Sequence, residues 1–323
     1  MPTTDAMHQR QHVWTRYWAG GAAHSCATSF GEHYEGAIAA FWRRILDDTP
    51  GGARLLDVAT GSGAIPRLWR SWRSTDVWDA VDLASHTPPW AAEAGEGLRY
   101  HPAVPAESLP FPAASFDLVT SQYGLEYCDL ARAVPELLRV RASQGSVALV
   151  LHHVASRPVE LARTELGHLD WAQSPDGLIT ACARMLDLAA LATTPEGRRR
   201  LAQDPAAEAA RVCFNAAQVA LRQRAEAVDG ADVLGEITDG VGALLQLAMQ
   251  QGAAQAHASL ASWRTALNDH RWRLKELCDH ALDRPKMQAL ADQLSAVGLR
   301  TEAGTVDEGP HLMGWSLRGT PPR

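Results

Sequence analysis

Short apolar runs separated by turn residues alternate with helical stretches through the first half of the chain. Five runs have the continuous apolar character of strands that are covered on both faces: 53–59, 77–83, 98–104, 115–121 and 145–153. The segments between most of these runs carry helical patterns. This alternation predicts βαβ units and a largely parallel sheet.

A different periodicity begins after the fifth run. From 157 to 286 the sequence is rich in Ala, Leu and Arg, and apolar residues recur at helical spacing without a strand-like run. Two predicted helical faces carry the apolar sets Leu234, Ile237, Val241, Leu244, Leu245, Ala248 and Trp263, Leu267, Leu274, Leu277. We therefore expect a large α-helical insertion.

The last part of the chain returns to the mixed pattern. Residues 287–299 predict a helix closed by Gly298, and the runs 300–306 and 311–317 flank a turn, which predicts a hairpin. The expected fold is α/β: a Rossmann-like, seven-stranded, mostly parallel sheet with a terminal antiparallel hairpin and a large α-helical insertion.

The expected organisation has three parts. Residues 1–52 contain two helical segments separated by a Gly/Ser-rich break, 53–156 and 287–323 form the sheet core, and 157–286 form the insertion.

Composition excludes several classes of function. The 323 residues are 46% hydrophobic and carry a net charge of −7, and the lysines are Lys275 and Lys286, so we expect no nucleic-acid partner. Apolar runs fall short of the ~18 residues that a membrane span needs, and the N-terminus lacks the apolar segment of a signal peptide. The five cysteines show no CxxC pair, which indicates reduced thiols without disulfides. We expect a cytoplasmic protein without membrane association.

Residues 55–69, LLDVATGSGAIPRLW, carry the most informative pattern. An apolar strand containing Asp57 leads into a small-residue turn with Gly61 and Gly63 and then into a helix. Glycine allows the backbone to approach a ligand closely, and a helix N-terminus presents unpaired N–H groups. This arrangement is typical of nucleotide-binding folds, although such a turn also serves to pack a strand on a helix.

An acidic residue follows at the next strand. Asp82 comes 82 − 57 = 25 residues after Asp57, near the offset of about 20 at which a carboxylate meets the hydroxyls of an adenosine ribose. Asp79, on the same strand face, is a competing candidate for this role.

The segments LLDVATGSG, VDLA and AESLPFPAASFDLVTSQYGLEYCD resemble the class I S-adenosylmethionine-dependent methyltransferases, especially the type 11 group that includes the ubiquinone and menaquinone biosynthesis methylases. The resemblance covers about residues 50–155 together with the terminal helix and hairpin. It implies an enzyme that uses S-adenosylmethionine as cofactor.

The resemblance also implies cofactor contacts at Asp57, Ala59, Gly61, Gly63, Asp82, Leu83, Ala106, Glu107 and Gln122. Asp57 would meet the methionine amino group through the turn, Asp82 would hold the ribose, and Gln122 would lie near the methionine portion. Ala59 stands where the family turn has its first glycine. Pro105 replaces an aspartate that often precedes the Ala-Glu pair at the adenine edge.

Candidate catalytic residues follow the fourth and fifth strands, because ligands in open parallel sheets bind at the carboxyl ends of the strands. They are Tyr123, Glu126 and His153. His152 and His153 point to opposite faces if the strand persists, and we expect His153 to be the base or to orient the acceptor. No cluster has the spacing of a metal site, so we expect no metal.

These features predict methyl transfer to an oxygen or nitrogen of a small-molecule acceptor, such as an aromatic or secondary metabolite. The insertion would wall the acceptor pocket or provide the surface of a homodimer. Aromatic residues before the first strand would form a lid over the site: Trp14, Tyr17, Trp18, Phe30 and Tyr34. Two alternatives remain: a noncatalytic binding partner, and an NAD-dependent oxidoreductase, which Pro66 at the third glycine position of the fingerprint disfavours.

Overall fold

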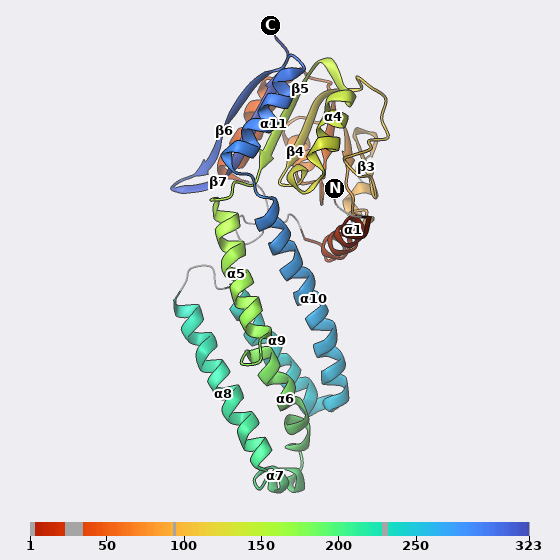
Figure 1. Cartoon of the computed structure of the whole chain (residues 1–323). Helices are drawn as coiled ribbons and strands as arrows, with labels where there is room; N and C mark the ends of the chain where they lie inside the picture. Colours follow the sequence, from red (N-terminus) through yellow and green to blue (C-terminus); the bar gives the residue numbers. More distant parts are fainter. Residues whose placement is uncertain (1–3, 23–34, 93–94, 228–231, 323) are drawn as a thin grey trace. The chain divides into compact units, whose positions relative to one another are not determined.

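Seven strands form one sheet in the order β3-β2-β1-β4-β5-β7-β6 (Figure 1). The computed structural model describes residues 4–22, 35–92, 95–227 and 232–322. The strands are β1 (Arg54–Val58), β2 (Val77–Val81), β3 (Leu98–His101), β4 (Phe116–Gln122), β5 (Arg141–Leu151), β6 (Arg300–Glu308) and β7 (His311–Thr320). Strands β1 to β5 pair in parallel, and β7 is antiparallel to both β5 and β6. The predicted fold class is confirmed.

All seven strands differ from their predicted bounds by one to four residues at one or both ends, and β3 and β5 are two examples. β3 ends at His101, because the chain turns at Ala103, which has a left-handed φ of 59°. β5 begins already at Arg141, paired with Phe116, and ends at Leu151, so His152 and His153 lie just beyond the strand.

Helices cover both faces of the sheet, which explains the continuous apolar strands. Leu56 and Val58 of β1 belong to one core cluster with residues of α4 (Leu130–Val140) and α11 (Arg284–Ala296). Leu55 belongs to a second cluster with residues of α2 (Gly36–Asp47) and α3 (Ala64–Trp72). Successive side chains of a strand point to opposite faces, so β1, β2, β4, β5 and β7 each contribute to both clusters.

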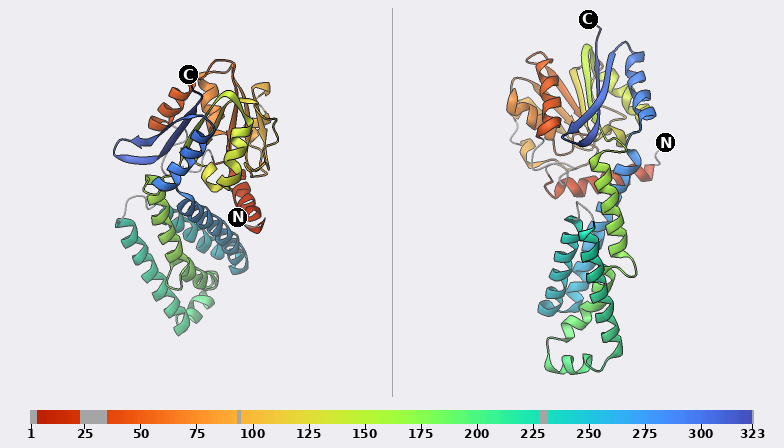
Figure 2. Two further views of the ribbon diagram at one scale, coloured as in Figure 1. Left: turned by 45° about the horizontal axis from the view of Figure 1, so that its top comes forward. Right: turned by 90° about the vertical axis from the view of Figure 1, so that its left-hand side faces the viewer.

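The chain divides into two compact units, Met1–Glu160 with Glu276–Arg323, and Leu161–Lys275. The insertion predicted from the sequence spans 157–286. Its helices are α5 (Arg157–Gln173), α6 (Leu178–Leu191), α7 (Pro195–Leu201), α8 (Pro205–Glu226), α9 (Asp232–Gln251) and α10 (Ala253–His280), which run from yellow-green to blue in Figure 2. By their bounds, α5 and α10 cross from one unit into the other. Within the second unit α6 packs against α8 and α9. The buried face of α9 includes Leu234, Ile237, Val241, Leu244 and Ala248, as its periodicity predicted.

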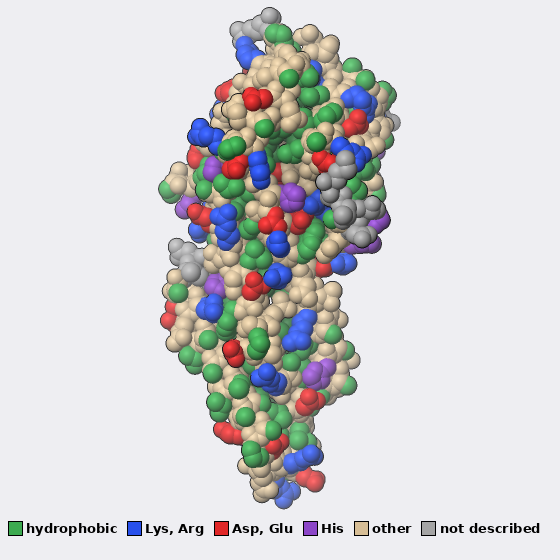
Figure 3. Space-filling view, viewed as in Figure 1, with side chains coloured by type: hydrophobic (Ala, Val, Ile, Leu, Met, Phe, Trp, Pro, Cys, Tyr) green, Lys and Arg blue, Asp and Glu red, His purple; other side chains and the backbone are tan. Residues whose placement is uncertain are grey.

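The described surface is mixed in charge. Lys and Arg side chains are interspersed with Asp and Glu side chains on the face drawn in Figure 3. Val212 and Val219 of α8 are 57% and 45% exposed. No partner chain is present to test whether such side chains form a dimer contact, so the expected homodimer stays a prediction.

Among the described residues, no helix has the length and apolar character needed to cross a bilayer. Cys128, Cys182, Cys213 and Cys278 are free thiols, and Cys26 lies outside the described residues.

Candidate active site

The turn between β1 and α3 adopts a left-handed backbone conformation at three of its small residues. Ala59, Gly61 and Gly63 have left-handed φ angles of 53°, 58° and 78°. A Cβ on Gly61 would lie 2.5 Å from Cζ2 of Trp18, so an indole ring occupies the space that a side chain would need. Glycine meets both requirements at Gly61, the unusual φ and the close approach.

Asp82 follows β2 and is held by this turn. Its Oδ2 accepts a hydrogen bond from the Gly61 N–H at 2.7 Å, and its Oδ1 accepts one from the Ala84 N–H at 2.8 Å. The residue is 7% exposed, and this burial raises the pKa of its carboxyl to about 6. The carboxylate is therefore fixed in orientation and poorly solvated.

The competing Asp79 has other partners. Arg99 donates two hydrogen bonds to its carboxylate, at 2.9 and 2.8 Å, and His101 Nε2 lies 2.8 Å from Oδ1. Although burial alone would raise the pKa of Asp79, these bonds lower it. Asp82 lines the cavity described below, and Asp79 is not among its lining residues.

Asp57 lies in β1, beneath the turn. It is 1% exposed, and its Oδ1 accepts a hydrogen bond from Thr120 Oγ1 at 2.7 Å. Burial raises the pKa of Asp57 to about 7, the bond from Thr120 opposes that rise, and the charge of Asp82 adds to it. Two carboxyl groups with raised pKa values thus lie at the ends of neighbouring strands.

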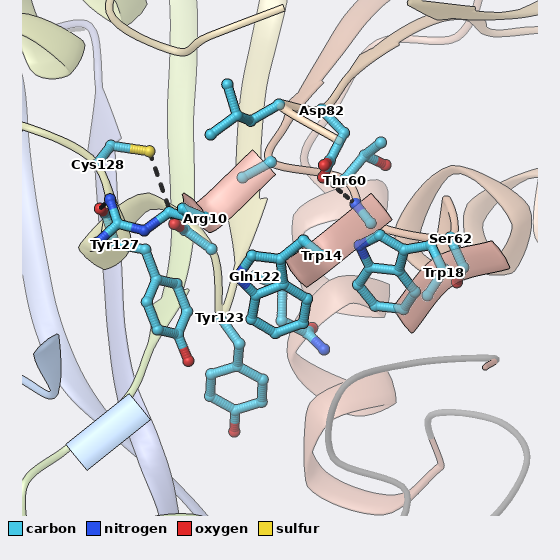
Figure 4. Close-up of a pocket in the computed structure, with 15 residues that line it drawn as sticks. Arg10, Trp14, Trp18, Thr60, Ser62, Asp82, Gln122, Tyr123, Tyr127 and Cys128 are labelled. Atoms are coloured by element: carbon cyan, nitrogen blue, oxygen red, sulfur yellow. Dashed lines mark hydrogen bonds between the residues drawn. The ribbon is translucent and has the colours of Figure 1, made fainter. Parts of the chain in front are cut away.

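A cavity opens at the carboxyl ends of β1 and β4, where the strand order reverses (Figure 4). Three groups of residues line it: Arg10, Trp14 and Trp18 of α1 (Thr4–Ala19); Ala59, Thr60, Gly61, Ser62, Ala64, Asp82 and Leu83 around the turn; and Gln122, Tyr123, Gly124, Tyr127 and Cys128 after β4. Ligands of open α/β sheets bind at this kind of position.

Gln122 lines this cavity and carries a buried amide. Its Oε1 accepts a hydrogen bond from Trp42 Nε1 at 2.5 Å, which fixes the amide. Its Nε2 is buried and has no hydrogen-bond partner among the described residues. A buried donor without a partner costs free energy, so this atom is suited to a ligand oxygen.

Tyr123 and Glu126 have structural partners. Tyr123 has a left-handed φ of 52°, its hydroxyl donates to the Met313 carbonyl at 2.9 Å, and its ring stacks on His152 with centroids 4.3 Å apart. Glu126, in the short helix η3 (Leu125–Tyr127), is 2% exposed and binds His152 through Oε1. Tyr123 lines the cavity, whereas Glu126 is not among its lining residues.

Asp57, Gly63 and three further predicted positions also lie outside the set of lining residues. The His153 ring packs on Trp315 with centroids 4.4 Å apart, and its Nδ1 accepts a hydrogen bond from the Ala155 N–H. Glu107 Oε1 accepts one from the Asp129 N–H at 2.8 Å, and Ala106 is buried in the core. Their roles at the site stay predictions.

The α1 helix brings a residue that the sequence analysis did not single out. Arg10 donates through Nη1 to the Tyr127 carbonyl and through Nε and Nη2 to Glu276 of α10. These partners are 117 and 266 residues away in the sequence, so no local pattern indicated them. Trp14 and Trp18 of the predicted lid also line the cavity, whereas Phe30 and Tyr34 lie outside the described residues.

Comparison with known proteins bears directly on this site. A family model described as a methyltransferase domain matches residues 56–149, which include the glycine turn, Asp82 and Gln122. This region is a class I S-adenosylmethionine-dependent methyltransferase domain. The family that the sequence resembles is therefore confirmed, together with its cofactor.

Curated relatives match the same part of the chain. The uncharacterized methyltransferase YcgJ of Bacillus subtilis is 33% identical over 113 residues, 33% of this chain and 43% of the relative. A malonyl-acyl-carrier-protein O-methyltransferase of Enterobacter lignolyticus is 33% identical over 107 residues, 33% of this chain and 41% of the relative. The ubiquinone/menaquinone biosynthesis C-methyltransferase of Laribacter hongkongensis is 30% identical over 124 residues, 36% of this chain and 50% of the relative.

The chain thus spans about half the length of these relatives or less, 43%, 41% and 50%. The crystal structure of YcgJ aligns with 27% identity and a TM-score of 0.33, covering 40% of this chain and 58% of that chain. The sequence relatives, rather than this structural alignment, carry the assignment.

The residues of the methyltransferase domain fit the cofactor. The Asp82 carboxylate can accept hydrogen bonds from a vicinal diol, and the Gln122 Nε2 donor has no hydrogen-bond partner in the described part of the chain. The turn at Gly61 brings backbone to the cavity, where the Trp18 ring lies against it. Asp82, Gln122 and the turn are therefore the groups that would hold S-adenosylmethionine.

Proposed function

We propose that this protein transfers the methyl group of S-adenosylmethionine to an oxygen or nitrogen atom of a small-molecule acceptor. The observation that carries the proposal is the cavity in which Asp82, the Gly61 turn and Gln122 meet, inside the region that matches the methyltransferase domain. S-adenosylmethionine supplies an electrophilic methyl group when bound. The protein then has to hold an acceptor atom in line with that group and to exclude water.

The side chains that line the cavity favour an acceptor that loses its proton without a strong general base. Among the described lining residues, Asp82 is the only carboxylate, and there is no imidazole. Burial raises the pKa of the Cys128 thiol, and the Tyr123 hydroxyl already donates to Met313. Phenols of low pKa and neutral amines match such a site, since a strong general base is not required for them.

Aromatic side chains support a flat acceptor. Trp14, Tyr123 and Tyr127 line the cavity, and the centroids of Trp14 and Tyr127 lie 6.0 Å apart with ring planes 63° from parallel. Aromatic walls of this kind bury large apolar area and exclude water. Glu126 and His152 would act as positioning residues, because they fix Tyr123 and Tyr127 from behind the wall.

The experiment has two stages. Calorimetric titration of the full chain with S-adenosylmethionine, S-adenosylhomocysteine and NAD tests the cofactor, and we expect micromolar binding of the first two only. Methyl incorporation from labelled S-adenosylmethionine into panels of phenols, amines, carboxylates and quinone-ring carbons then tests the acceptor. Binding without transfer to any panel would support the noncatalytic alternative, and labelling of quinone-ring carbons alone would contradict the oxygen or nitrogen acceptor proposed here.

A further inference from the structure

Two tryptophan rings of α1 form one aromatic surface in the wall of the cavity. Trp14 and Trp18 stack with centroids 5.6 Å apart and planes 20° from parallel, and both line the cavity (Figure 4). Trp18 is 8% exposed and lies on Gly61, the residue whose N–H binds Asp82. The indole rings therefore adjoin the groups that hold the cofactor.

The position of these rings is fixed by polar contacts along α1. Arg10, one turn before Trp14, bridges the Tyr127 carbonyl and Glu276. Thr15 Oγ1 accepts a hydrogen bond from the Ser85 N–H at 2.9 Å, close to Asp82 in the chain. Contacts on both sides of the helix thus hold the rings before any ligand arrives, which lowers the entropic cost of binding.

The charges around the cavity favour a cation. Arg10 is the only basic residue among the described residues that line it, and its guanidinium is neutralised by Glu276. The Asp82 carboxylate lies in the wall of the cavity. The π-face of an indole attracts a cation, and the attraction grows when the cation is desolvated.

We propose that the Trp14–Trp18 pair binds the positively charged sulfonium and thereby discriminates S-adenosylmethionine from its neutral thioether product. This inference rests on the proposed function, because it assumes that S-adenosylmethionine occupies the cavity. The consequence is that the rings retain the charged methyl donor and release S-adenosylhomocysteine, which offers the same adenosine and amino-acid groups without the charge.

The test compares the affinities of the two ligands in the full chain by calorimetry. We expect the parent to bind S-adenosylmethionine more tightly than S-adenosylhomocysteine, and Trp18→Leu and Trp14→Leu each to reduce that preference about 3- to 30-fold. Trp18→Phe keeps an aromatic face with a weaker quadrupole and should retain part of the preference. This variant controls for the loss of packing that Trp18→Leu also causes.

Trp90→Leu is the matched control. Trp90 packs on Gly63 of the same turn and donates to the Ser62 carbonyl at 2.8 Å, but it is not among the lining residues of the cavity. Its loss should change both affinities alike and leave their ratio within about twofold.

The outcomes separate this inference from the function on which it rests. Equal loss of both affinities in Trp14→Leu and Trp18→Leu, or a parent without preference, would overturn the role of the rings and leave the cofactor in place. A parent that binds neither ligand would overturn the proposed function itself.

Discussion

One carboxylate oxygen of Glu126 accepts two hydrogen bonds from the same residue, His152. The backbone N–H and the ring Nδ1 of His152 each lie 2.7 Å from Glu126 Oε1. The two residues follow the adjacent strands β4 and β5, and the pair is buried, with side chains 0% and 1% exposed. This pair ties the segment that carries Tyr127 to the end of β5.

Loss of this carboxylate should destabilise the protein. Glu126→Ala leaves two buried donors of His152 without an acceptor, and we expect the free energy of unfolding to fall by about 2–4 kcal/mol. Glu126→Gln retains an oxygen acceptor and should cost clearly less. Urea unfolding measures both variants, and equal costs for Ala and Gln would contradict the hydrogen-bond argument.

Asp82→Ala should weaken S-adenosylmethionine binding at least about 30-fold, because the cofactor loses a carboxylate that can accept two hydrogen bonds and the Gly61 turn loses its anchor. Calorimetry measures the dissociation constant. Asp79→Asn is the control, since Asp79 binds Arg99 and His101 instead. An equal loss of affinity in Asp79→Asn would show that the wrong aspartate has been assigned to the ribose.

The raised pKa of Asp57 links stability to pH. Its folded pKa of about 7 lies above the ordinary value of 3.8, so between these pH values the folded state keeps a proton that the unfolded state has lost. This group's contribution to stability is present below pH 4 and is lost as pH rises through 7. Asp57→Asn should therefore raise the thermal midpoint of the ligand-free protein at pH 8 by a few degrees. This shift corresponds to a gain on the order of 1 kcal/mol or more in the free energy of unfolding.

The same variant should not gain stability at pH 4. At that pH the Asp57 carboxyl is protonated in the folded parent and about half protonated in the unfolded parent, so its ionisation favours unfolding far less than at pH 8. Thermal unfolding followed by circular dichroism at the two pH values gives the comparison. A gain of equal size at both values would mean that Asn stabilises by packing and that the pKa of Asp57 is not raised.

Glu276→Gln should speed the release of the cofactor. Glu276 holds Arg10, and with it α1 and its tryptophans, through a pair whose side chains are only 17% and 12% exposed. Loss of about 1–2 kcal/mol of this interaction would raise the dissociation rate of S-adenosylhomocysteine about 5- to 30-fold. Stopped-flow tryptophan fluorescence follows the release.

Arg271→Gln serves as the matched control for that measurement. It breaks the exposed ion pair with Asp170 in the helical unit, whose side chains are 45% and 53% exposed, and exposed pairs contribute about 0–1 kcal/mol. Its release rate should equal that of the parent. An unchanged rate in Glu276→Gln would show that Arg10 holds α1 without help from Glu276.

Local patterns were sufficient for much of this protein. Five apolar runs predicted the parallel strands because burial on both faces demands continuous apolar residues, and two runs flanking a turn predicted the hairpin. Gly61 marked the turn after β1 because its backbone has a φ that other residues avoid. The position of Asp82 also follows from the chain, since a parallel crossover returns the next strand to the same edge of the sheet. These features depend on neighbours within about one βαβ unit.

Other features depend on contacts between distant segments. Alternation indicated that His152 and His153 point apart, but only the packed structure decided which one meets Glu126 and which one meets Trp315. The bridge from Arg10 to Glu276 joins residues 266 apart, and the bond that fixes the Gln122 amide comes from Trp42, 80 residues away. Sequence periodicity reports which side chains are buried, whereas tertiary packing decides which of them touch.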